Sequence, residues 1–524
     1  MSEQTKQFIR AIEASVRKGS LGESSEKGDC IFLRVLPKHL IPVCHACLSN
    51  GAVFDSAFVS LADPARKEFN VYYIFQVATI HRMVVITSRG SAFDALSESV
   101  NAALWDERKI QDLTGLRLAG IPDSRPLIFH AESGFPPARP IGGQPIKPPK
   151  STAYEMPGTG TEGEFEVAVG PVHAGIIEPG HFRFHVSGEK INKMEVRMFY
   201  LHRGIEKVAE GHQAVSLLPL IEQISGDEAV ANSVAYCQAV EQALGVAVPK
   251  RAESIRAILM ELERIYSHLA DLGGMTVDVG FYLPSARFAV LREDIMRLNQ
   301  AVFGNRFLHG SCAIGGVSAD LNSAKQEYLA RRMRQMLESL DQLERVTFTS
   351  STFLDRIFTT GAVSRGISKD LSLVGPPARA CGIHTDLRRM LPYSAYARTE
   401  INESIEKEGG DVLARFIVKL AEIKESARLI LSLSSSLPSG ALRSESPPKK
   451  RKEGSVGVGW AEAPRGSCTM LVEISPAGAV RRLAYRSPSF RNWRALEKAV
   501  LGNIVPDFPL INKSFNLSYA GTDM

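Results

Sequence analysis

The sequence lacks the features that would place it across a membrane or outside the cell. None of its apolar runs reaches the roughly 18–20 residues that a helix needs to cross a bilayer. Its N-terminal stretch is polar and amphipathic, without the apolar core of a secretory signal. Only seven of the 524 residues are cysteines, and they are scattered. We therefore expect a reducing compartment rather than a disulfide framework.

Common signatures of nucleotide binding and hydrolysis are also missing. No Gly-x-Gly-x-x-Gly follows a predicted strand, no Walker A string occurs, and there is no Gly-x-Ser-x-Gly elbow. These absences exclude a familiar nucleotide loop or nucleophile elbow within the chain. A formal net charge of +5 is mild for this length, so we expect no nucleic-acid partner.

Two short motifs have simple structural interpretations. Cys44 and Cys47 have the CxxC spacing, but a structural zinc site usually needs four ligands and no second pair is near. We expect two unrelated buried thiols. The basic run at 446–454 is interpreted as a solvated loop, with a localisation string or a phosphate-binding patch as the alternative.

The chain has ordinary globular composition and is too long for one core. With 44% hydrophobic and 23% charged residues, we expect an α+β fold in two parts. Residues 1–130 mix strands with a helix and predict a small α+β module. Residues 131–165 are rich in Pro and Gly and predict a linker. Residues 166–524 predict a large, mainly helical domain with small sheets.

Periodicity indicates several individual elements. Residues 70–77 and 81–88 alternate as paired strands, and 181–204 predicts a hairpin that turns at Ser187-Gly188. The apolar spacing of 250–273 predicts a long helix. Further helices are expected at 91–115, 285–303, 323–345 and 399–434.

Several sequence blocks resemble known subunits of respiratory complexes. "WDERKIQDLTGLRLAGIPDSRPLIF", 105–129, resembles the small hydrophilic subunit of complex I. Blocks in the second part resemble the large subunit of formate-hydrogenlyase-type membrane-bound [NiFe] hydrogenases and, less closely, the quinone-site subunit of complex I. These blocks are 170–184, 199–211, 248–269, 374–388, 459–466 and 502–514. The resemblance runs from about residue 30 to the end and implies the α+β fold of a fused chain.

The resemblance also implies where a metal centre would stand. The hydrogenase family holds its Ni–Fe centre with four thiolates from two CxxC motifs, and soft thiolates suit these metals. Here the first motif aligns with "SGDE", placing Ser225 and Glu228 at the cysteine positions, and the second with "SYAG", placing Ser518 and Gly521 there. We therefore expect no Ni–Fe centre and no bound metal. A hard-metal site at Glu228 is the disfavoured alternative.

The quinone constellation implied by the complex I resemblance is mostly absent. Its His, Tyr and Asp positions align with Pro179, Gly226 and Asp278, and only Asp278 matches. His173 and His181 lie nearby in sequence. Either could replace the missing His, or both could be structural histidines bonded to backbone.

Three charged residues match positions around the family's reaction centre. Glu206 and Arg465 align with its acidic residue and its overhanging arginine, and Glu178 falls near a proton-relay carboxylate. We predict proton relay for Glu206 and Glu178 if burial shifts their pKa values. The alternative for Glu206 and Arg465 is a buried ion network that fixes the fold.

Taken together, the resemblance implies a peripheral subunit on the cytoplasmic face of the inner membrane. It would pass electrons from an Fe–S small subunit to quinone or another small acceptor in a cavity lined by Ser225, Glu228, Asp278, Arg465 and Ser518. Antiporter-like membrane subunits would be further partners, and any NAD or flavin chemistry would belong to a partner. The alternative is a catalytically silent structural or coupling subunit.

Overall fold

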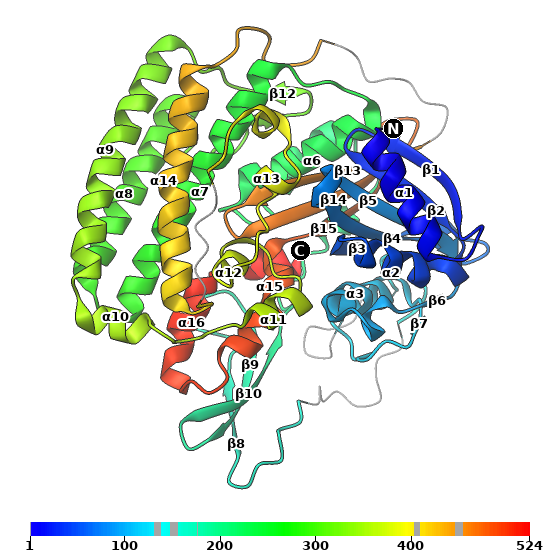
Figure 1. Ribbon diagram of the computed structural model, residues 1–524, viewed down its shortest axis with the longest axis horizontal. Helices are drawn as coiled ribbons and strands as arrows, with labels where there is room; N and C mark the ends of the chain where they lie inside the picture. The colour runs from blue at the N-terminus through cyan, green and yellow to red at the C-terminus, as the bar shows by residue number, and fades with distance from the viewer. Residues whose placement is uncertain (1, 130–137, 147–155, 175–176, 403–408, 446–453) are drawn as a thin grey trace.

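The computed structural model describes the chain apart from residues 1, 130–137, 147–155, 175–176, 403–408 and 446–453 (Figure 1). Its first part is built on a five-stranded sheet with strand order β1-β2-β5-β4-β3, in which β2 and β5 are parallel and the other pairs antiparallel. The strands are β1 Leu21–Lys27, β2 Cys30–Val35, β3 Val53–Asp63, β4 Glu68–Val77 and β5 Arg82–Gly90. The predicted strand pair is therefore confirmed as β4 and β5.

The predicted helix at 91–115 is wrong over its first half. Only α3, Leu104–Thr114, is α-helical, and it follows β6 Phe93–Asp94 and two short 3₁₀ turns. The Glu107 carboxylate accepts hydrogen bonds from the backbone N–H groups of Leu96 (2.7 Å) and Ser97 (3.1 Å). A side chain of α3 therefore pairs these N–H groups, and the apolar residues around them are buried without forming a helix.

The second part is dominated by long helices. α7 Lys250–Asp278, α8 Tyr282–Phe303, α9 Ser323–Phe348 and α14 Val412–Ser435 form one packed group of helices (Figure 1). These helices confirm three of the expected helices, but the fourth begins at 412 rather than 399. The Asp411 carboxylate accepts a hydrogen bond from Ala414 N (2.8 Å), which caps α14 at this point. Part of the wrong segment, 403–408, lies outside the described residues.

Two small sheets complete the second part. The expected hairpin is confirmed as β9 His181–Ser187 and β10 Lys190–Arg197, joined by β8 Phe165–Val169. The other sheet contains β13 Ser455–Ala463, β14 Gly466–Ile474 and β15 Val480–Arg486. Helix α6, Ala229–Leu244, lies directly on it, since a Cβ atom at Gly457 or Gly459 would clash with the helix backbone. This contact fixes the start of α6 over the β13–β14 hairpin.

Buried ion pairs join the two parts of the chain. Asp55 of β3 pairs with Arg486 of β15 at 2.5 Å, and Asp106 of α3 pairs with Arg491 at 3.1 Å. Arg491 lies on α15, Pro488–Ala499. The overall mixture of helices and small sheets confirms the expected α+β fold. Within the described ranges, no helix has both the length and the apolarity to cross a bilayer.

Candidate functional site

The two segments that replace the cysteine motifs meet in space. Ser225 lies between α5 Leu218–Glu222 and α6, and Ser518 caps the short C-terminal helix α17, Tyr519–Asp523. Their hydroxyl oxygens are 3.0 Å apart. A Cβ atom at Gly521 would lie 3.0 Å from Ser518 Oγ and 3.4 Å from Ser225 Cβ. Glu228 N donates to Ser225 O at 3.0 Å, so all four positions lie together.

Arg203 holds these two segments beside each other. Its guanidinium donates to the carbonyl oxygens of Gln223 (2.9 Å) and Ile224 (2.8 Å) in the first segment and of Ala520 (3.1 Å) in the second. Five donors in a rigid fork allow one arginine to bridge several carbonyl groups. Arg203 follows directly after the "FYLH" stretch, but nothing in its spacing predicted this role.

Arg465 covers the serine pair from the β13–β14 hairpin. Its guanidinium donates to both oxygens of Asp227, at 2.5 and 3.2 Å, and lies 3.2 Å from Glu228 Oε1. Burial acts to raise the pKa of Asp227, but the positive charge of Arg465 outweighs it and lowers that pKa below its usual range. The pKa of Glu228 is raised, chiefly by burial. Asp227 stands between the two cysteine positions and was missed because neither motif has a ligand at its place.

Behind Arg465 lies a layer of buried polar side chains. Arg465 Nε donates to Asn516 O, and the amide of Asn516 donates to Asp271. Asp271 also accepts from Lys419 at 2.6 Å. Both of the latter come from long helices, α7 and α14. The layer connects the site to the helix group and holds Arg465 in place.

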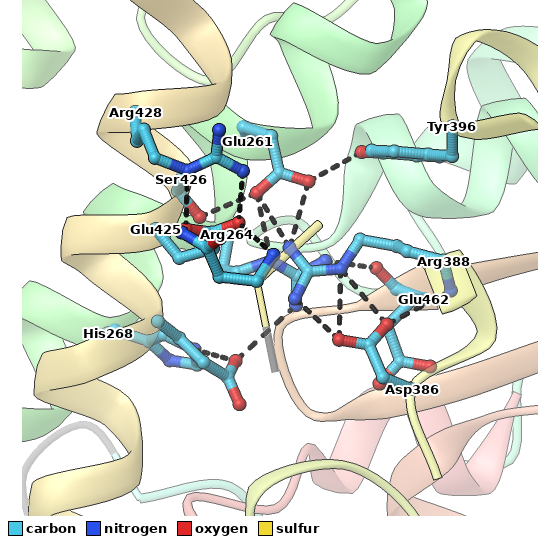
Figure 2. A network of polar contacts seen from close by, with 12 residues as sticks. Glu261, Arg264, His268, Asp386, Arg388, Tyr396, Glu425, Ser426, Arg428 and Glu462 are labelled. Atoms are coloured by element: carbon cyan, nitrogen blue, oxygen red, sulfur yellow. Dashed lines mark hydrogen bonds and ion pairs between the residues drawn. The ribbon is translucent and has the colours of Figure 1, made fainter. Parts of the chain in front are cut away.

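A larger ionic network lies deeper between α7 and α14 (Figure 2). His268 donates to or accepts from Glu422 at 2.9 Å, and Glu422 pairs with Arg379 at 2.7 Å. Arg388 pairs with both Glu261 (3.0 Å) and Asp386 (2.6 Å). All of these side chains are buried and matched in charge, so the network ties loops 379–388 to the helices.

Glu206 takes part in a separate ionic cluster. It lies on α4, Ile205–Val208, where its carboxylate accepts from Lys109 Nζ and Arg482 Nη2, both at 2.7 Å, and from Tyr485 N at 3.0 Å. Burial acts to raise its pKa, but Lys109 and Arg482 lower it to about 2. Such a carboxylate stays ionised near neutral pH. This geometry favours the ion-network interpretation, and proton relay by Glu206 stays a prediction.

The other expected residues lie at different distances from the serine pair. Glu178 borders it, because its carboxylate accepts from Ala520 N at 3.0 Å. His173 and His181 are bonded to backbone carbonyl oxygens, at 2.7 Å (Gly180) and 3.1 Å (Gly170). Asp278 is exposed at the end of α7. The structure therefore groups Ser225, Glu228, Ser518, Arg465 and Glu178, and places Asp278 at the surface.

Gly226 marks the open side of the cluster. It is exposed, and a Cβ atom added to it would meet nothing within 4 Å. The complex I resemblance places a quinone-site tyrosine at this position. Ser225 and Ser518, in contrast, are almost fully buried. Space for a small molecule or a partner therefore exists at the Gly226 side.

Prominent cavities of the described residues lie elsewhere. One of about 380 Å³ lies between the β1–β2 turn and α6, one of about 460 Å³ lies beside α14, and one of about 360 Å³ separates α8 from α9. None of these three is lined by Ser225, Glu228 or Ser518. The expected cavity around the serine pair is not among them.

The donor atoms present do not suit a Ni–Fe centre. Two hydroxyl groups, one carboxyl group and a glycine replace four soft thiolates, and hydroxyl oxygens are poor ligands for nickel. Cys44 and Cys47 lie buried on α2, Leu40–Ser49, where burial raises the pKa of the Cys47 thiol to about 12. Within the described part of the chain, no three His, Cys, Asp or Glu residues group as metal ligands would.

Comparison with known proteins identifies the family. Residues 33–141 match the family described as respiratory-chain NADH dehydrogenase, 30 Kd subunit, and 278–456 match the 49 Kd subunit. Formate hydrogenlyase subunit 5 of Escherichia coli K12 is 31% identical over 479 residues, which cover 87% of this chain and 82% of the relative. The chain belongs to the family of fused complex I-like 30-kDa and 49-kDa subunits.

Other members of this complex I-like family are similar over most of the second part. Hydrogenase-4 component G of Escherichia coli K12 is 32% identical, covering 82% of this chain and 76% of the relative. An NADH-quinone oxidoreductase chain of Dehalococcoides mccartyi BAV1 is 32% identical, covering 68% and 98%. A chain of the archaeal membrane-bound sulfane sulfur reductase superposes with a TM-score of 0.64 at 25% identity, covering 69% and 99%.

Proposed function

We propose that this chain is a hydrophilic subunit of a membrane-attached, complex I-like oxidoreductase that works without a Ni–Fe centre. It would receive electrons from an Fe–S partner and deliver them to quinone or another small acceptor. The names of its relatives include hydrogenase, NADH-quinone oxidoreductase and sulfane sulfur reductase chains, so the family supports electron transfer more firmly than any one acceptor.

The convergence of Ser225, Glu228, Ser518 and Gly521 is the observation on which this proposal rests. These residues keep the arrangement of a reaction centre while supplying no thiolate. A small organic acceptor needs hydrogen-bonding groups and access rather than soft ligands. Hydroxyl groups at Ser225 and Ser518 and the open side at Gly226 supply both.

The location and partners of the chain follow from the same proposal. It would sit peripherally on the cytoplasmic face of the inner membrane, between an Fe–S small subunit and antiporter-like membrane subunits. NAD or flavin chemistry would belong to a partner, because the chain shows no nucleotide loop of its own.

A specific observation favours a second candidate, a catalytically silent coupling subunit. Arg465 and Glu206, which correspond to the family's reaction-centre charges, are both engaged in ion pairs. Residues held in this way would stiffen the subunit without touching a substrate. In that case the chain would transmit movement to membrane partners or hold the assembly together.

Purification from native membranes in mild detergent provides the first test. Copurification of an Fe–S small subunit would support electron transfer, and membrane subunits without one would favour the coupling role. Metal analysis of the same complex should find no stoichiometric nickel; nickel in stoichiometric amount would contradict the proposal.

Variants then distinguish the two candidates. In complexes shown to be intact, Arg465→Met should abolish reduction of a soluble quinone analogue if electrons pass through this site. Unchanged electron transfer would favour the coupling role. Lys207→Gln is a matched control, because Lys207 is exposed and pairs only with nearby Glu210.

A further inference from the structure

Two buried polar side chains at the start of α6 lack partners. Glu228 is fully buried, and apart from its ion pair with Arg465 neither carboxyl oxygen has a hydrogen-bond partner among the described residues. Asn232 lies one helical turn later, and within the same described part its buried Nδ2 donates to nothing. Unpaired buried polar atoms are costly, so such a pair calls for a physical explanation.

The local charge count provides one. Asp227, Glu228 and Glu263 approach one another, and Arg465 is the cation that pairs with the first two. Lys419 is already matched by Asp271. One guanidinium cannot neutralise three carboxylates in a site of low dielectric, so at least one buried carboxyl group must hold a proton.

Hydrogen bonding distinguishes Glu228 from Glu263. Glu263 accepts from the backbone N–H groups of Val230 (2.7 Å) and Ala231 (2.9 Å) in the first turn of α6. Such bonds at a helix N-terminus stabilise an ionised carboxylate. Glu228 accepts none of this kind. Burial raises the pKa of both groups, that of Glu263 to about 8, but the backbone donors make Glu228 the better place for a proton.

We propose that Glu228 holds a proton in the resting protein and donates it to a two-electron, two-proton acceptor bound beside the serine pair. This inference rests on the proposed function, in which an Fe–S partner supplies two electrons. Glu228 supplies one proton and water the other. The O–H bond of Glu228 breaks, the acceptor gains an O–H bond, and water later restores the proton. Arg465 stabilises the carboxylate that remains in between.

The groups that face Glu228 are consistent with this role. Its own loop contributes Asp227, α7 contributes Glu263 and Tyr266, and the sheet contributes Arg465, Cys468 and Tyr485. Burial raises the pKa of Cys468, Tyr266 and Tyr485, which are therefore neutral near pH 7. Only Arg465 and the other two carboxyl groups respond to the charge of Glu228.

Infrared spectroscopy of the purified complex can test the protonation directly. A protonated carboxyl group has a C=O stretch that shifts in D2O, and isotopically labelled glutamate assigns it to glutamate. At neutral pH we expect this band in the native protein and in Glu263→Gln, and its loss in Glu228→Gln. A band lost only in Glu263→Gln, or absent from the native protein, would overturn the proposal. Glu228→Asp, which shifts the band rather than removing it, serves if Glu228→Gln does not fold.

Turnover separates this proposal from the proposed function. With a quinone analogue as the acceptor, Glu228→Gln should lower turnover by about 10²-fold or more, the usual contribution of a positioned proton donor. Electron transfer to ferricyanide, which takes no proton, should be unchanged. Full turnover without the carboxyl band would contradict the proton donor alone. A complex that shows the band but transfers no electrons to either acceptor would contradict both the donor role and the proposed function.

Discussion

At the scale of single residues, Arg465 balances the charge of two carboxyl groups. Its replacement by Met would leave Asp227 without its bidentate partner and Glu228 without its only cation. We expect Arg465→Met to lower the free energy of unfolding by about 3 kcal/mol, near the lower end for a broken buried pair because Asp227 is partly exposed. Denaturant unfolding of the purified chain would measure this loss.

The double variant Arg465→Met/Glu228→Gln is the informative control. Removing the buried acid also removes the uncompensated charge, so part of the lost stability should return. A double variant no more stable than Arg465→Met would show that Glu228 and Arg465 do not interact as described.

Asp523 should make stability depend on pH. Its carboxylate accepts from Phe199 N (2.8 Å) and Leu201 N (2.9 Å), yet burial, aided by the charge of Glu178, raises its pKa to about 7. The folded protein therefore binds a proton more tightly than the unfolded chain, whose aspartate has a pKa near about 4. The contribution is fully present below about pH 4 and is lost as the pH rises through about 7.

Asp523→Asn should remove this dependence. The difference in unfolding free energy between the native protein and the variant should change by about 4 kcal/mol between pH 4 and pH 8, since each pKa unit corresponds to about 1.4 kcal/mol. Urea unfolding at a series of pH values would test it. A difference that does not vary with pH would contradict the raised pKa.

At the scale of elements, the essential feature is the meeting of the loop before α6 with α17. The hydroxyl oxygens of Ser225 and Ser518 are 3.0 Å apart, close enough for the corresponding cysteines to bond. All seven native cysteines are buried and unpaired, so background oxidation should be low. We expect the Ser225→Cys/Ser518→Cys variant to form an internal disulfide under mild oxidation, detected by mass spectrometry of peptides.

Arg203→Met in the same background should slow that reaction. Arg203 bonds to carbonyl groups of both segments, and without it they should separate more often. Each single-cysteine variant controls for pairing with native thiols. Equal rates of oxidation with and without Arg203 would mean that other contacts hold the segments together.

The sequence could predict which segments form the candidate site but not its electrostatics. Alignment to two motifs identified Ser225, Glu228, Ser518 and Gly521, and the 3.6-residue period identified α7. Asp227 and Arg203 were missed, because their roles depend on carbonyl groups and charges that are distant in sequence. Tertiary contacts of this kind decide pKa values, and periodicity contains no information about them.

A similar limit explains the one clear error in secondary structure. The segment 91–103 has apolar residues at helical spacing, but a single carboxylate, Glu107, takes two of its N–H groups. The hydrophobic residues are buried as expected, so the pattern predicted burial correctly and conformation wrongly. Local spacing cannot reveal a side chain that competes for backbone hydrogen bonds.

At the scale of the whole molecule, Glu206 connects the two parts of the chain. Lys109 comes from α3 in the first part, and Arg482 comes from β15 in the second. Glu206 lies between them and neutralises part of their charge. Glu206→Gln would leave two buried cations facing each other, so we expect the free energy of unfolding at pH 7 to fall by about 3 kcal/mol. Hydrogen exchange in α3 should become faster as its contact with β15 loosens.

The dependence on pH provides a sharper test of this contact. Because Lys109 and Arg482 hold the pKa of Glu206 at about 2, its stabilisation is present above the ordinary glutamate value of about 4.3 and is lost as the pH falls toward 2. The stability gap between the native protein and Glu206→Gln should therefore close in acid, the opposite sign to Asp523. Lys207→Gln, whose exposed partner is Glu210, should change stability by less than about 1 kcal/mol at any pH. If Glu206→Gln behaves like Lys207→Gln, the two parts are held together by their apolar contacts and other ion pairs, and Glu206 becomes available again for proton transfer.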